Sequence, residues 1–186
     1  MKKQKISLII AFAVVIAIAA IALLNSYAQG KAATYAAGLR VGTAAPDLYF
    51  SIAGGSSANV SAYKGNTIVL WFVATWCSGC AEGNLLLNSN YALFKQKGIK
   101  VVELELYNDL GYNGPSIMDF VKTYAPAAYA SGVVIPAYAS YNMTLTYDAK
   151  GYLDVYYLIA PNGKILYTNS PLASTFSQLA EEINAT

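Results

Sequence analysis

The sequence predicts an α/β domain with a mixed central sheet, preceded by an apolar N-terminal segment. Residues 67–74 (TIVLWFVA) form a continuous apolar, β-branched and aromatic run, which is typical of a strand buried on both faces. A Cys-x-x-Cys motif, Cys77 to Cys80, follows this run at once and opens a helical pattern. Further strand and helix patterns alternate and end in a hairpin and a helix, which is the order expected of an α/β fold.

The elements are predicted in this order along the chain. A strand at 47–52 ends at Gly54-Gly55, and 60–63 is its expected short partner. The buried strand 67–74 is followed by a helix at 81–97, which Gly98 ends, and by a strand at 101–106. A short helix is expected at 116–124, a hairpin from 153–160 and 165–168 around the turn 161–164, and a closing helix at 176–183.

The N-terminal segment predicts a membrane anchor. Of the 186 residues, 56% are hydrophobic and 12% are charged, and part of this excess lies in the 19-residue apolar stretch 6–24, directly after three lysines. A membrane span needs about 17–25 residues, whereas a signal-peptide core has about 7–15. We therefore expect 1–24 to be a signal-anchor or transmembrane helix, 25–37 a tether, and 38–186 a domain outside the cytoplasm. The alternative is secretion after cleavage near Ala28.

The charge distribution argues against nucleic acid as a partner. The formal net charge is +2, but without Lys2, Lys3 and Lys5 nine basic residues remain against ten acidic ones, a net charge of −1. Arg40 is the only arginine, and the body contains no run of like charges.

The cysteine pair is the expected centre of covalent chemistry. A helix N-terminus lowers the pKa of a thiol, and the thiolate is the nucleophilic form. Cys77 should therefore attack a partner's disulfide, and Cys80, one helical turn later, should resolve the mixed disulfide. Trp76 would offer a flat apolar surface for a docking peptide.

The absence of histidine excludes several other chemistries. No Ser-His or Cys-His pair and no imidazole metal ligand can form, and two cysteines cannot complete a four-ligand zinc site. We expect neither a metal nor a cofactor. A purely structural disulfide and half of a metal site completed by a second chain remain open alternatives, although so short a disulfide loop gains little from closure entropy.

Three stretches resemble the thioredoxin superfamily. They are VGTAAPDL at 41–48, YKGN followed by TIVLWFVATWCSGC at 63–80, and YLI with PNGKI at 157–165. Within the superfamily the chain is most similar to membrane-anchored extracytoplasmic thiol-disulfide oxidoreductases of the TlpA and ResA type and to the AhpC/TSA group. The resemblance implies a thioredoxin-like fold and a redox-active Cys77–Cys80 disulfide supported by Trp76, Ser78 and Gly79. It also implies exported proteins with thiols or disulfides as partners, and an electron donor in the membrane.

Two positions depart from the pattern of this family. Gly79 stands where the family commonly has proline before the second cysteine, so no reduction potential can be carried over. Asp154 stands where the family has a cis-proline that faces the cysteines, and we expect a trans bond before it because a non-proline cis peptide costs about 2.5–4 kcal/mol. If Asp154 faces the sulfurs, its charge would raise the thiol pKa and favour a more reducing pair. Alternatively, it points to solvent at the end of a strand.

Two glutamates in the predicted strand 101–106 are candidate proton acceptors for Cys80. Side chains alternate along a strand, so Glu103 and Glu105 share one face. A buried carboxylate near the cysteines would have a raised pKa and could take the proton. The alternative is that both lie near an exposed strand end or pair with lysines.

Other functions on the same fold remain to be separated. A peroxiredoxin-like peroxidase needs Thr and Pro before its cysteine and an Arg nearby, but Thr75 stands two residues before Cys77 rather than three. A copper metallochaperone uses a wider cysteine pair and a distant histidine. A redox-silent binding module would keep its disulfide closed. Eleven of the sixteen tyrosines fall between 107 and 167, where ordinary packing or a peptide-binding surface would explain them.

Overall fold

The computed structural model describes residues 19–20 and 39–186. The predicted anchor 1–24, apart from Ala19 and Ala20, and the predicted tether 25–37 lie outside the described residues. Within the described part of the chain, no helix combines the length and the apolar character that crossing a membrane requires.

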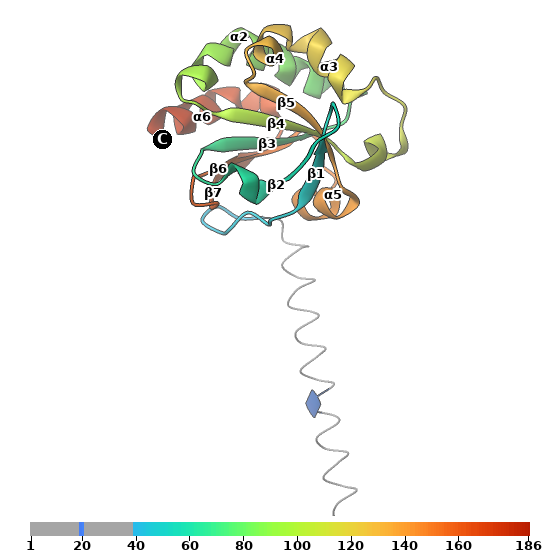
Figure 1. The fold of residues 1–186 in the computed structure, drawn as a ribbon, viewed down its shortest axis with the longest axis vertical. Helices are drawn as coiled ribbons and strands as arrows, with labels where there is room; N and C mark the ends of the chain where they lie inside the picture. Colours follow the sequence, from blue (N-terminus) through green and yellow to red (C-terminus); the bar gives the residue numbers. More distant parts are fainter. Residues whose placement is uncertain (1–18, 21–38) are drawn as a thin grey trace, which may run out of the picture. The chain divides into compact units, whose positions relative to one another are not determined.

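Residues 39–186 form a seven-stranded mixed sheet with helices on both faces (Figure 1). The strand order is β2-β1-β5-β4-β3-β6-β7, in which β3, β4 and β5 are parallel and the other pairs are antiparallel. The strands are β1 (Tyr49–Ile52), β2 (Ser57–Asn59), β3 (Ile68–Val73), β4 (Lys100–Glu105), β5 (Val134–Ala139), β6 (Val155–Ile159) and β7 (Ile165–Asn169). The fold predicted from the sequence, a thioredoxin-like α/β domain, is therefore present.

The helices divide between the two faces of the sheet. One face packs against α2 (Ser78–Gln96), α3 (Ile117–Tyr124), α4 (Pro126–Ala130) and α6 (Leu172–Ala185). The other is covered by α5 (Tyr141–Tyr147) and the 3-10 helix η1 (Val60–Tyr63). Figure 1 shows α2, α3 and α4 above the sheet and α5 below it.

The central strand β3 serves both hydrophobic cores. Val69, Trp71 and Val73 belong to the core under α2. The alternate residues Ile68, Leu70 and Phe72 belong to the core on the α5 side. All six side chains are buried. The period-two alternation of side chains explains this division. The prediction of a strand buried on both faces is confirmed.

The prediction that 60–63 is a short strand paired with the strand at 47–52 is wrong. The partner of β1 is β2, with Tyr49 opposite Asn59, and the following residues form η1 instead of a strand. Asp47 Oδ1 accepts a hydrogen bond from the Ser61 backbone N–H at 2.8 Å, and Val60 is buried in the core. These tertiary contacts override the strand pattern of the segment.

Three elements between 125 and 147 were not predicted, namely α4, β5 and α5. Pro136 stands inside β5, and proline within an apolar run argues against a central strand because it lacks a backbone N–H. The structure accommodates it because the pairing of β5 with β1 begins only at Ala137, opposite Ile52. At Pro136 the strand stands opposite Glu103 of β4, and on the β1 side only its carbonyl is used, which accepts a hydrogen bond from the Ala53 backbone N–H at 2.9 Å.

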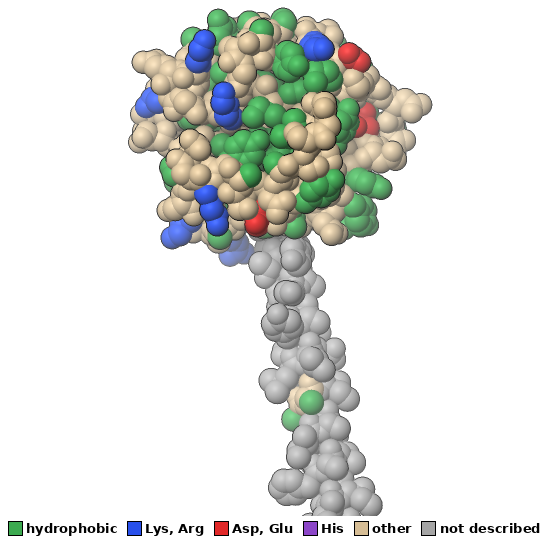
Figure 2. Space-filling model, viewed as in Figure 1, with side chains coloured by type: hydrophobic (Ala, Val, Ile, Leu, Met, Phe, Trp, Pro, Cys, Tyr) green, Lys and Arg blue, Asp and Glu red, His purple; other side chains and the backbone are tan. Residues whose placement is uncertain are grey.

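The predicted helix and strand boundaries shift by a few residues. Helix α2 begins at Ser78 rather than 81, α6 at Leu172 rather than 176, and β6 at Val155 rather than 153. The face shown in Figure 2 is mostly uncharged, with charged side chains scattered among hydrophobic and other uncharged residues.

Candidate functional site

The two cysteines lie at the junction between the end of β3 and the start of α2. Cys77 is the N-cap of α2, and its Sγ accepts a hydrogen bond from the Cys80 backbone N–H at 3.2 Å. Cys77 is half-buried, Cys80 is fully buried, and both are free thiols. An N-cap sulfur receives the unpaired N–H groups and the positive end of the helix dipole, so this position favours a thiolate.

The pKa values of the two thiols diverge. The hydrogen bond from Cys80 lowers the pKa of Cys77 to about 7, against the opposing effects of burial and of the Asp154 charge. The hydrogen bond to Cys77 and burial both raise the pKa of Cys80. At neutral pH the half-buried Cys77 sulfur is therefore the more readily ionised of the two, and the buried Cys80 sulfur keeps its proton.

Asp154 faces the cysteines, and the alternative that it points to solvent is wrong. The residue is 3% exposed and sits at a positive φ of 54°, just before β6. Its Oδ1 accepts hydrogen bonds from Trp71 Nε1 at 2.6 Å and from the Leu172 backbone N–H at 3.1 Å. Its Oδ2 is buried without a hydrogen-bond partner among the described residues. The peptide bond before Asp154 is trans, as expected.

Gly79 lies between the Asp154 carboxylate and the nucleophilic sulfur. A Cβ placed on Gly79 would be 3.6 Å from Asp154 Oδ2 and 3.9 Å from Cys77 Sγ. The carboxylate charge raises the pKa of both thiols, while burial raises the pKa of Asp154 itself. Because glycine has no side chain, no side-chain atom of residue 79 separates the charge from the sulfur.

Glu103 is buried behind Cys80 and is linked to it by Asn84. Asn84 Nδ2 donates to Glu103 Oε1 at 2.6 Å and to the Cys80 backbone carbonyl at 3.3 Å. Burial raises the pKa of Glu103 to about 8, and its Oε2 has no partner among the described residues. Glu103 is therefore neither at an exposed strand end nor paired with a lysine.

Glu105 shares the face of Glu103 but lies at the end of β4, away from the pair. It is half-buried, and burial and the Asp109 charge raise its pKa to about 7. Of the three carboxylates, only Asp154 is among the charges that shift the pKa of the two thiols, and Glu105 also lacks the hydrogen-bonded link through Asn84 that Glu103 has. The structure thus brings Glu103 and Asp154 to the cysteines and leaves Glu105 beside the loop after β4.

The loop after β4 holds Trp76 in place. Trp76 is 39% exposed, its Nε1 donates to the Asp109 carbonyl at 2.9 Å, and its ring lies 4.8 Å from that of Tyr112. Asp109 accepts from the Thr75 backbone N–H and hydroxyl, each at 2.8 Å. A Cβ on Gly114 would overlap Thr75 Oγ1, so this close approach requires glycine. The hydroxyl of Thr75 is thus committed to Asp109.

Sequence reasoning missed Asn84 and Asp109. Asn84 carries a usable signal, because it is a polar residue four positions after Cys80 on the face that the helix buries. Asp109 carries none, because it sits in the η2 turn (Tyr107–Gly111), where Asn108, Asp109 and Leu110 all have positive φ. Such backbone conformations are set by tertiary contacts.

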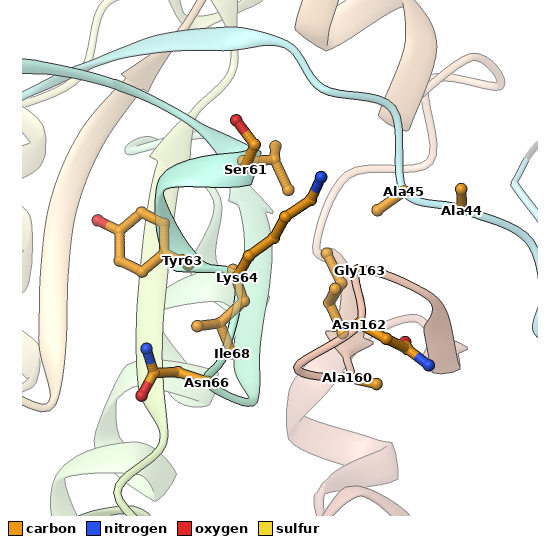
Figure 3. Close-up of a pocket in the computed structure, with 12 residues that line it drawn as sticks. Ala44, Ala45, Ser61, Tyr63, Lys64, Asn66, Ile68, Ala160, Asn162 and Gly163 are labelled. Carbon is orange, nitrogen blue, oxygen red and sulfur yellow. The ribbon is translucent and has the colours of Figure 1, made fainter.

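A further pocket lies at the opposite end of the sheet. It has a volume of about 100 Å³ and is lined mainly by apolar groups beside Lys64 and the 161–164 turn (Figure 3). Ile68, the first residue of β3, is part of its lining, whereas the cysteines follow the last residue. This pocket is therefore separate from the redox site.

Comparison with known proteins agrees with this geometry. The family model described as Redoxin matches residues 40–183. A thiol-disulfide oxidoreductase ResA of Bacillus thuringiensis subsp. konkukian is 27% identical over 86 residues, which are 46% of this chain and 47% of that protein. The chain thus spans about half the length of this relative. A ResA of Bacillus cereus is 27% identical over 131 residues, 69% of this chain and 68% of that protein.

A solved structure shows the same fold. It is a Chlorobium tepidum protein assigned as a thiol:disulfide interchange protein DsbE, which superposes with a TM-score of 0.60 at 26% identity. The match covers 80% of this chain and 98% of that one.

Proposed function

Because this chain belongs to the Redoxin family of the thioredoxin superfamily, we propose that it is a thiol-disulfide oxidoreductase that acts on exported polypeptides through Cys77 and Cys80. The observation that carries the proposal is the asymmetry of the pair. One sulfur is accessible at a helix N-terminus with a pKa of about 7, and the other is buried one turn later with a raised pKa. The relatives of the ResA and DsbE type support the same activity.

The reduction of a substrate disulfide proceeds in two displacements. The Cys77 thiolate attacks one substrate sulfur, the substrate S–S bond breaks, and a mixed disulfide and one substrate thiolate result. Cys80 then loses its proton and attacks Cys77 Sγ, which breaks the mixed disulfide and releases the second substrate thiolate. The protein pair is oxidised to a disulfide, and the substrate gains the two electrons.

The proton of Cys80 needs a nearby acceptor. Asp154 is the carboxylate whose charge acts on both thiols, and its buried Oδ2 has no hydrogen-bond partner among the described residues. Glu103 reaches Cys80 only through Asn84. We therefore assign the acceptor role to Asp154, with Glu103 behind it, and assign none to Glu105.

The direct test uses the two cysteine variants. Cys77→Ser should abolish the reduction of insulin disulfides, because no nucleophile remains. Cys80→Ser should instead accumulate a mixed disulfide, since Cys77 still attacks but nothing resolves the product. Insulin reduction by Cys77→Ser at the wild-type rate would overturn the proposal.

The proposed direction of electron flow is towards the substrate. A carboxylate beside the pair disfavours the thiolate and therefore the reduced form, so the pair gives up its electrons more readily. We expect a reduction potential closer to that of thioredoxin, about −270 mV, than to that of DsbA, about −120 mV. Equilibration with glutathione or dithiothreitol buffers measures it, and a value near −120 mV would contradict a reductase role.

The proposed location is the outer side of the membrane, with a membrane protein as electron donor. The support is the sequence of residues 1–24, in which three lysines precede a 19-residue stretch that is apolar except for Ser7. Carbonate extraction should leave the protein in the membrane pellet, and a membrane-impermeant maleimide should label Cys77 in intact cells. Soluble protein that starts near Ala28 would show that the segment is cleaved.

A further inference from the structure

A tyrosine-lined hollow lies at the same end of the sheet as the cysteines. Strands β3, β4 and β5 are parallel, so their C-terminal ends meet at one edge, where open α/β sheets commonly bind ligands. Cys77 follows β3, the η2 turn follows β4, and Ser140 follows β5. Figure 1 shows the yellow-green connection after β4 beyond this end of the sheet. The hollow here has a volume of about 440 Å³.

The walls of the hollow are aromatic. Four tyrosines line it, and between 38% and 57% of each side chain is exposed: Tyr49, Tyr107, Tyr138 and Tyr141. The rings of Tyr107 and Tyr141 meet edge to face at 5.5 Å. Tyrosine rings can bind cations, because each ring face carries partial negative charge.

A carboxylate lies among these rings. Glu105 on β4 stands in register with Tyr138 on β5, and Tyr138 stands in register with Ser51 on β1. These three residues form a row across neighbouring strands, and all three line the hollow. Burial has already removed part of the water from Glu105, and Asp109 lies close enough to raise its pKa. None of the described lining residues is lysine or arginine, so an incoming cation would stabilise the Glu105 carboxylate without a built-in competitor.

A second hollow lies between this site and the loop that packs on Trp76. It has a volume of about 250 Å³ and shares Glu105, Asn108 and Tyr138 with the first. Tyr112 is part of its lining and packs on Trp76, the residue before Cys77. The hollowed surface therefore extends from Glu105 to the ring that packs on Trp76.

We propose that the four tyrosines and Glu105 form a docking subsite for a lysine or arginine side chain of the polypeptide substrate. The inference rests on the proposed function and deepens it, because it makes the enzyme selective for disulfides with a basic residue nearby. Charge complementarity identifies the occupant as a cation: a carboxylate and the face of an aromatic ring both attract positive charge, and both repel an acidic side chain.

The test compares matched disulfide peptides with the reduced full-length protein in detergent. In each pair one peptide carries lysine and the other carries glutamine at the same position. From one pair to the next, this position lies farther from the reacting cysteine. Stopped-flow rates of the first displacement give a lysine-to-glutamine ratio, which we expect to reach about tenfold at the best separation. Because the readout is a ratio, a change in thiol reactivity affects both peptides and cancels.

Variants locate the source of the preference. Glu105→Gln should bring the ratio close to one, and Tyr141→Leu should reduce it several-fold, because each removes part of the attraction for the cation. Glu181→Gln, at an exposed site on α6, is the matched control and should keep the wild-type ratio. A wild-type ratio of one at every separation, or a ratio that both subsite variants leave unchanged, would overturn the subsite. Both peptides remaining inert would instead overturn the proposed function.

Discussion

At the scale of single residues, opposing charges set the reactivity of Cys77. The N-cap hydrogen bond stabilises its thiolate, and Asp154 on the other side of Gly79 destabilises it. The lowered pKa of about 7 is the net result. Asp154 therefore counteracts the effect of the helix N-terminus on this thiol.

The reactivity of Cys77 should follow its pKa. Iodoacetamide should modify the reduced protein at a rate that rises with pH as the thiolate forms, with a midpoint near pH 7. Cys80 should stay unmodified, because it is buried and its pKa is raised. In urea the midpoint should move to about 8.5, the value of a free thiol. A midpoint at or above 8.5 in the folded protein would contradict the N-cap argument.

Removal of the Asp154 charge should make the pair more oxidising. Asp154→Asn keeps an oxygen for Trp71 Nε1 but no longer repels the Cys77 thiolate, so the Cys77 pKa falls. Only the reduced form contains that thiolate, so the reduced form gains stability and the potential rises by about 20 mV. Redox titration measures the shift, and Glu182→Gln on α6 serves as the exposed-carboxylate control. A fall in the potential would refute this electrostatic role.

At the scale of elements, the contact between α2 and β3 positions the pair. A Cβ on Gly83 would lie 2.8 Å from Trp71 Cζ2, so the helix sits on the indole without room for a side chain. The same indole donates to Asp154. The position of α2, and with it that of Cys77, is thus coupled to the carboxylate through one tryptophan.

Glycine-to-alanine substitutions in α2 should show that the contact of Gly83 with Trp71 affects stability more than helix propensity does. Gly83→Ala should lower the free energy of unfolding by about 1–2 kcal/mol, because an overpacking cost of up to about 3 kcal/mol exceeds the gain of about 1 kcal/mol from replacing glycine in a helix. Gly79→Ala, in the same helix, meets neighbours only at 3.6 Å or more and should cost less. Urea unfolding of the two variants checks the order. An equally stable Gly83→Ala would show that α2 can shift freely.

At the scale of the whole molecule, buried acids make stability depend on pH. Burial raises the pKa of Glu103 to about 8 and that of Glu105 to about 7, and it also raises the pKa of Asp154. In the unfolded chain these carboxyl groups have pKa values of about 4. Between these values the folded state binds more protons than the unfolded state, so stability falls as pH rises.

Glu103→Gln should remove much of this loss. In a Cys77→Ser background, which eliminates the thiolate, the free energy of unfolding should fall between about pH 4.5 and 8. When Glu103→Gln is added to this background, the free energy of unfolding should fall less over the same range. At about pH 8 the two proteins should differ by up to a few kcal/mol. The amide keeps the size of the side chain but never carries a charge. Parallel slopes for the two proteins would mean that Glu103 ionises normally in the folded state.

The predictable part of the fold follows from local patterns. The run at 67–74, the motif after it and the 161–164 turn each encode an element without help from distant residues, and the structure contains all three. The 60–63 segment and β5 were misjudged because distant contacts decide them. Asp47 and the core hold η1, and the late start of the β1 pairing accommodates Pro136.

The sequence by itself determined where the proposed chemistry lies: two cysteines three positions apart at the start of a helix, in a chain without histidine. Spacing of three residues within one helical turn is a local property, so it can be read from the chain. Only the tertiary structure decided which carboxylates act on the pair. Asp154 is 77 positions beyond Cys77 and Glu103 is in another strand, and the fold brings both to α2 while it leaves Glu105 among tyrosines. Electrostatic effects depend on distance and burial, and packing between remote segments sets both.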